Sequence, residues 1–118
     1  MQETKILGNT GESIVAEFLK KKGFKLLAQN YCARCGEVDL IAQKDEYVVF
    51  VEVKTRKTNY FPTSTVVTYS KQRKIVNTAQ WFVLKHQIRD KVLRFDIATV
   101  IYADSGYEIE YIENAFTG

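Results

Sequence analysis

The chain has 118 residues, of which 46% are hydrophobic and 26% are charged, so it can bury one core without disulfides or metals. We therefore expect a single domain over residues 1–118. The formal net charge of +3 is too small to identify a nucleic-acid-binding protein by itself. No apolar run is long enough to span a bilayer or to resemble a signal peptide, so we expect a cytoplasmic protein with no membrane partner.

A helix is expected first, over about residues 9–22. Asn9 and Glu12 have the spacing of a capping box at a helix N-terminus, and Gly23 is typical of a helix stop. Glu12 lies at the edge of the apolar stripe of this helix. The stripe consists of Val15, Phe18 and Leu19.

Three strands are expected next, over residues 24–31, 37–43 and 47–54. A turn at residues 44–46 indicates that the second and third strands form a hairpin. The third strand is apolar and β-branched over most of its length, which is typical of a strand buried on both faces.

Residues 55–69 are polar and contain Pro62, so an irregular segment is expected. Ser70 is the expected N-cap of a second helix that runs to about Gln87. Strands over residues 92–102 and 107–113 end the chain. The order α-β-β-β-α-β-β predicts an α/β (α+β) fold with a mixed central sheet flanked by helices.

Glu52 and Lys54, at the end of the third strand, are the most informative residues. Strand side chains alternate, so both share a face with Phe50, where the desolvation of charge is unfavourable. The second strand supplies Asp39. Two carboxylates suit Mg²⁺, or Mn²⁺ in its place, and Lys54 would orient or deprotonate a metal-bound water, or stabilise charge on a phosphate. The alternative is a structural Glu52–Lys54 ion pair.

Glu12 has two explanations, which do not exclude each other: it caps the first helix, or it serves the metal site from that helix. A basic segment follows Glu52, and the chain has no Asp or Glu between Glu52 and Asp90. This segment predicts contacts with nucleic-acid phosphates, with Tyr60, Phe61 and Tyr69 placed to stack on bases; the alternative is a solvated surface. Its basic residues are Arg56, Lys57, Lys71, Arg73 and Lys74.

Cys32 and Cys35 have the spacing of half a zinc site, but the chain contains no other cysteine. We expect two unliganded, reduced thiols; a four-cysteine site shared across a dimer is the alternative. Arg94 and Asp96 lie on one face of a predicted strand, and we expect them to form a structural ion pair outside the active site.

Glu12, the run Gly36–Ile41 and the run Phe50–Arg56 together resemble the PD-(D/E)XK nuclease signature, with Val38 in place of the Pro. The whole chain resembles the YraN-like family of predicted endonucleases, distantly similar to archaeal Holliday junction resolvases. The resemblance implies a restriction-endonuclease-like core with its site at one edge of the sheet. It implies the following roles: Asp39, Glu52 and the Val53 backbone carbonyl as metal ligands, Lys54 as the catalytic lysine and Glu12 as a helix-borne acid.

The leading hypothesis is therefore a Mg²⁺-dependent endonuclease that hydrolyses phosphodiester bonds. The resolvase likeness favours structured or branched DNA over RNA, and a homodimer would present two sites to two strands. Two other classes stay open. One is a non-catalytic nucleic-acid-binding module in a DNA repair, recombination or uptake complex, and the other is a protein-interaction scaffold.

Overall fold

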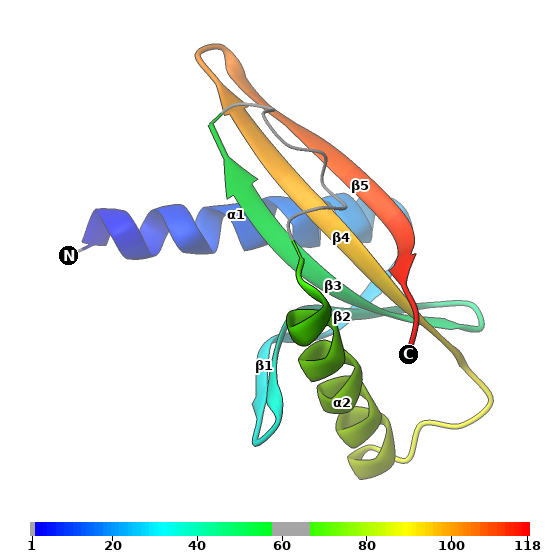
Figure 1. Ribbon diagram of the computed structural model, residues 1–118. Helices are drawn as coiled ribbons and strands as arrows, with labels where there is room; N and C mark the ends of the chain where they lie inside the picture. The colour runs from blue at the N-terminus through cyan, green and yellow to red at the C-terminus, as the bar shows by residue number, and fades with distance from the viewer. Residues whose placement is uncertain (1, 58–66) are drawn as a thin grey trace.

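A computed structural model describes residues 2–57 and 67–118 and has the predicted order of elements (Figure 1). The helix α1 (Gln2–Lys21) is followed by β1 (Lys25–Ala33), β2 (Gly36–Lys44) and β3 (Tyr47–Arg56). The second half contains α2 (Tyr69–Lys85), β4 (Val92–Ala103) and β5 (Gly106–Phe116). In the described part of the chain, neither helix combines the length and apolar character needed to cross a bilayer.

The five strands form one sheet in the order β1-β2-β3-β4-β5. The strands β3 and β4 are parallel, and the other neighbours are antiparallel. A parallel pair needs a long crossover connection, and α2 lies within that connection. The predicted mixed sheet is confirmed.

One helix covers each face of the sheet, and each helix closes a separate apolar cluster. On the α1 face, Val15 and Leu19 are buried against Leu40, Val49, Val51 and Val100. On the α2 face, the helix residues Ile75, Val76, Ala79 and Phe82 pack with Val48, Phe50, Phe95 and Ile97. The strand β3 contributes to both clusters, which confirms that it is buried on both faces. The arrangement is that of a restriction-endonuclease-like core.

The prediction for the start of α1 was wrong. The helix begins at Gln2 rather than near Asn9, so the backbone of Asn9 and Glu12 lies inside it, and the capping box does not exist. The spacing of polar residues in a capping box also occurs within helices, where Asn costs less than 1 kcal/mol relative to Ala. The predicted stop at Gly23 is confirmed, because this residue has a φ of +96°, which favours glycine.

Several other boundaries differ by one to three residues from the predictions, and two of them are informative. The N-cap of α2 is Thr68 rather than Ser70, and the Thr68 hydroxyl accepts a hydrogen bond from the Lys71 amide over 3.2 Å. The strand β5 continues to Phe116, three residues beyond its predicted end. Most of the expected irregular segment over residues 55–69 lies outside the described residues. The undescribed part contains Pro62 and the aromatic residues Tyr60 and Phe61.

The strands β2 and β3 are paired only from Lys44 and Tyr47 to Leu40 and Val51. Beyond Leu40, β2 stays paired with β1 as far as the turn at Gly36, and this hairpin lies beside α2 in Figure 1. The sheet therefore splits where the predicted acidic residues occur.

Candidate metal and nucleic-acid site

A side chain bridges the two strands where the sheet splits. Asp39 immediately precedes the last β2 residue paired with β3, and Val53 lies two residues beyond the last β3 residue paired with β2. The Val53 amide donates a hydrogen bond to Asp39 Oδ2 over 2.8 Å. Because the Asp39 carboxylate takes the place of a backbone partner, its position is fixed beside the end of β3.

Glu52 is 4% exposed and contacts two lysines through one oxygen. Its Oε2 lies 3.4 Å from Lys54 Nζ and 3.3 Å from Lys71 Nζ. The first contact confirms that Glu52 and Lys54 share a face, and it also forms the ion pair of the structural alternative. Lys71, a predicted phosphate contact, reaches Glu52 from α2, and its phosphate contact stays a prediction. Two ammonium groups at one oxygen show that this position attracts positive charge.

Asp39 has an altered acidity. Burial and the charge of Glu52 raise its pKa to about 7, although the Val53 hydrogen bond opposes the shift; Glu12 and Glu37 raise it further. Asp39 therefore titrates near neutral pH, and a bound cation would favour its ionised form.

Glu12 faces the same acidic cluster from α1. A Cβ added to Gly11 would lie 2.5 Å from Thr55 Cγ2, so the missing side chain lets α1 approach β3 closely next to Glu12. Burial raises the pKa of Glu12, and Glu37 and Glu52 add to the effect, whereas hydrogen bonding with Asn30 and Gln29 opposes it. Within the described residues, Glu12 Oε1 is buried without a hydrogen-bond partner. These contacts favour a role at the acidic cluster over helix capping.

The donor set fits a hard divalent cation that keeps part of its water shell. Among residues 2–57 and 67–118, no three Asp, Glu, His or Cys side chains form a ready metal cage. Mg²⁺ commonly binds through one or two carboxylates, with waters and substrate phosphates completing its shell. Asp39 and Glu52 supply two carboxylates whose mutual repulsion a cation would relieve. The role of the Val53 carbonyl stays a prediction.

The predicted basic residues do not form one patch. Lys71 and Lys74 line a pocket of about 500 Å³ at the β1–β2 turn, and Arg73 is exposed on α2 outside it. Lys57 lies at a separate pocket of about 350 Å³ beside the β4–β5 turn. Arg56 is half-buried at the end of β3.

Sequence reasoning missed Arg34, which lines the pocket at the β1–β2 turn together with Lys71 and Lys74. A single arginine between two cysteines gives no signal of its own, and only the docking of the hairpin on α2 brings it to the two lysines. Glu37, which raises the pKa of Asp39 and Glu12, was also given no role. Its position two residues before Asp39 could have indicated that the two carboxylates lie on one face of the strand.

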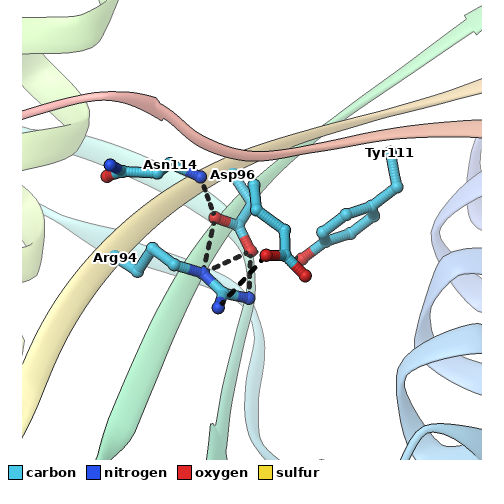
Figure 2. Close-up of polar contacts among 5 residues, drawn as sticks. Arg94, Asp96, Tyr111 and Asn114 are labelled. Atoms are coloured by element: carbon cyan, nitrogen blue, oxygen red, sulfur yellow. Dashed lines mark hydrogen bonds and ion pairs between the residues drawn. The ribbon is translucent and has the colours of Figure 1, made fainter.

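The predicted Arg94–Asp96 ion pair is confirmed, and Figure 2 shows its surroundings. Asp96 is fully buried and accepts hydrogen bonds from Arg94 Nε at 3.0 Å, Tyr111 Oη at 2.6 Å and the Asn114 amide at 2.9 Å. In the β3–β4 register Asp96 is paired with Val51, on the α1 face, whereas Glu52 faces α2. Asp96 therefore joins β4 to β5 and is separate from the acidic cluster.

Comparison with known proteins identifies the family of this chain. The family model described as uncharacterised protein family UPF0102 matches residues 11–100. A UPF0102 protein of Clostridium botulinum is 40% identical over 116 residues, covering 95% of this chain and 94% of its own. A UPF0102 protein of Vibrio parahaemolyticus is 40% identical over 113 residues, covering 94% and 92%. The chain belongs to UPF0102, the YraN family of the PD-(D/E)XK superfamily.

Proposed function

We propose that the protein is a metal-dependent endonuclease that hydrolyses phosphodiester bonds at the cluster of Asp39, Glu52 and Lys54. The observation that carries the proposal is the Val53–Asp39 hydrogen bond at the split of the sheet. It holds Asp39 close enough to the buried Glu52 for their repulsion to raise the pKa of Asp39. An isolated structural ion pair does not require this second carboxylate.

The residues suit the hydrolysis of a phosphodiester. A Mg²⁺ or Mn²⁺ ion bound here would supply a nucleophilic water at neutral pH and stabilise charge on the phosphate. Asp39 and Glu52 would hold the cation, with the Val53 carbonyl as a further ligand. Lys54 Nζ, 3.4 Å from Glu52 Oε2, orients the attacking water or donates to a phosphate oxygen. The partnerless Oε1 of Glu12 would accept a hydrogen bond from water in the cation's shell.

The proposed substrate is DNA rather than RNA, in a structured or branched form. The likeness of the family to resolvases supports this choice. The lysines beside the cluster, Lys54 and Lys71, support a nucleic-acid substrate of either kind, because nucleic-acid binding depends mainly on contacts between Lys or Arg and phosphates. A homodimer would present two such sites to two strands.

One observation favours a second candidate, a nucleic-acid-binding module that does not cut. Lys54 and Lys71 both contact Glu52 Oε2, so the charge of this carboxylate is already compensated. A protein that never binds metal would need the same pairing, since an unpaired buried carboxylate is strongly unfavourable.

Calorimetric titration with Mg²⁺ and Mn²⁺, in the presence and absence of branched DNA, separates the two candidates. The endonuclease binds metal, more tightly with DNA because phosphate completes the shell, and the Asp39→Asn/Glu52→Gln variant loses this binding. DNA binding without any metal binding, even in the complex, would contradict the endonuclease and support the non-cutting module.

A further inference from the structure

We propose that Arg34 and Lys74 bind a backbone phosphate of the nucleic-acid strand, beside the phosphate that reaches the acidic cluster. This inference rests on the proposed function, because it identifies how the substrate strand of that site is held. It concerns the pocket at the β1–β2 turn. The residues of this pocket that the argument uses are Cys32, Arg34, Cys35, Glu37, Lys71 and Lys74.

The pocket is built by close packing of the hairpin turn on α2. A Cβ added to Gly36 would lie 3.1 Å from Thr78 Oγ1 and 3.2 Å from Lys74 Cβ, and Gly36 has a φ of +153°. Cys35 Sγ lies 3.5 Å from Thr78 Oγ1, which donates a hydrogen bond to the Lys74 carbonyl over 2.8 Å. These contacts set the turn that carries Arg34 against the segment of α2 that carries Lys74.

The charge of the pocket suits a phosphodiester. Arg34, Lys71 and Lys74 bring three positive charges, against the one negative charge of Glu37. The planar guanidinium of an arginine matches two phosphate oxygens at once, while a lysine acts as a compact point charge. With a volume of about 500 Å³, the pocket has room for a phosphate and its flanking sugar atoms.

Lys71 connects this pocket to the acidic cluster. It lines the pocket, and its Nζ lies 3.3 Å from Glu52 Oε2. A strand with one phosphate at Asp39 and Glu52 therefore passes Lys71 on its way to Arg34 and Lys74. The α2 segment and the β1–β2 turn together define the direction in which the strand leaves the cluster.

The first experiment measures the binding of labelled single-stranded and branched DNA by fluorescence anisotropy, without divalent ions. The Arg34→Gln/Lys74→Gln variant is compared with Lys85→Gln/Arg89→Gln. This control removes two exposed charges, one from the last residue of α2 and one from the segment that follows it. The first variant should bind about tenfold more weakly, with a salt slope shallower by about 1 for each lost phosphate contact. If both variants lost DNA affinity equally, the effect would come from net charge alone, and the proposal would be overturned. Unchanged affinity in both variants would overturn it too.

The second experiment uses the thiols as probes of the pocket. Cys32 and Cys35 are the two cysteines of the chain, and both are free and exposed. Saturating DNA should slow their alkylation by iodoacetamide several-fold, whereas inorganic phosphate at the same phosphate concentration should not. An unchanged alkylation rate in DNA-bound protein would show that no DNA strand occupies this pocket. Equal protection by inorganic phosphate would show that the pocket binds free phosphate rather than a nucleic-acid strand, and would also overturn the proposal.

Neither experiment depends on cleavage. If the protein binds no metal and does not cut, the two experiments still test whether the pocket binds a nucleic-acid strand. If the pocket proves wrong while metal-dependent cleavage is observed, the strand follows another path from the same acidic cluster.

Discussion

The Val53 amide donates a hydrogen bond to Asp39 Oδ2 over 2.8 Å, at the point where β2 and β3 separate. The separation frees the end of β3 from its neighbour, and the hydrogen bond keeps one β2 side chain at that end. The neighbour of Val53 in the chain, Glu52, faces α2 and its lysine. A split sheet thus places two carboxylates and two ammonium groups around one small volume.

Metal binding should depend on pH in the neutral range. Burial and the charge of Glu52 raise the pKa of Asp39 to about 7, so below this pH the cation must displace a proton. We expect the affinity for Mn²⁺ to rise by up to about tenfold per pH unit below pH 7 and to level off above it. Calorimetry in two buffers of different ionisation enthalpy counts the released proton. A constant affinity from pH 6 to 8, without proton release, would rule out Asp39 as a ligand.

The same pKa has a consequence for stability in the absence of metal. The pKa of Asp39 rises from 3.8 to about 7 on folding, so the protonated carboxyl stabilises the protein fully below about pH 4. This contribution is lost as the pH rises through 7. Three pKa units correspond to about 4 kcal/mol, and we expect about half of this because solvent still reaches the group.

The Asp39→Asn variant avoids the ionisation and should keep the hydrogen bond from Val53. At pH 8, urea unfolding in EDTA should therefore show it about 2 kcal/mol more stable than the wild type, and the two should converge near pH 4. A variant that is less stable at pH 8 would show that the ionised carboxylate stabilises the fold.

Glu12→Gln distinguishes a role at the acidic cluster from a purely structural role. Loss of the charge near a bound cation should weaken Mn²⁺ affinity about fivefold, or about 1 kcal/mol. Stability should not decrease, because repulsion from Glu37 and Glu52 is relieved, whereas the loss of a structural hydrogen bond would cost about 1 kcal/mol. Glu17→Gln, at an exposed position of α1, is the control for both measurements. Lower stability with unchanged metal affinity would assign Glu12 a structural role.

Tyr111→Phe tests the buried network of Asp96. The Tyr111 hydroxyl donates to Asp96 over 2.6 Å, and its ring packs on Phe18 of α1 at 5.4 Å between centroids. Removal of a hydrogen bond to a buried carboxylate should destabilise the protein by about 1.5–3 kcal/mol. Tyr107→Phe, exposed on the same strand, should change the free energy of unfolding by less than about 0.5 kcal/mol. Equal effects in thermal unfolding would contradict the assigned role.

The order of elements, the mixed sheet and the pairing of Glu52 with Lys54 were all predictable, because they follow from local patterns. The buried run of β3 has no polar position before Glu52, and strand alternation then decides the face of Lys54. The start of α1 could not be predicted in the same way. Asn9 and Glu12 satisfy the spacing of a cap whether or not the helix continues upstream, and side-chain spacing alone does not distinguish the two cases.

The parts of the site that depend on long-range packing were not predictable. Lys71 appeared to be one member of a basic segment, and only the position of α2 over the sheet brings it to Glu52. Arg34 lines the same pocket as Lys74 because Gly36 allows the hairpin turn to contact α2 closely. The raised pKa of Asp39 also needs the tertiary structure, since it arises from burial and from carboxylates on other elements.

The endonuclease proposal is tested most directly by cleavage of labelled branched, flapped and single-stranded DNA in Mg²⁺ or Mn²⁺. Wild type, Lys54→Ala and the exposed control Lys85→Ala are purified in parallel, with folding checked by circular dichroism. We predict that wild type and Lys85→Ala cut at least one substrate in a metal-dependent manner. We also predict that Lys54→Ala stays folded and is slower by about 100-fold or more. Equal cleavage by Lys54→Ala, or none by a wild type that binds both metal and DNA, would contradict the proposal.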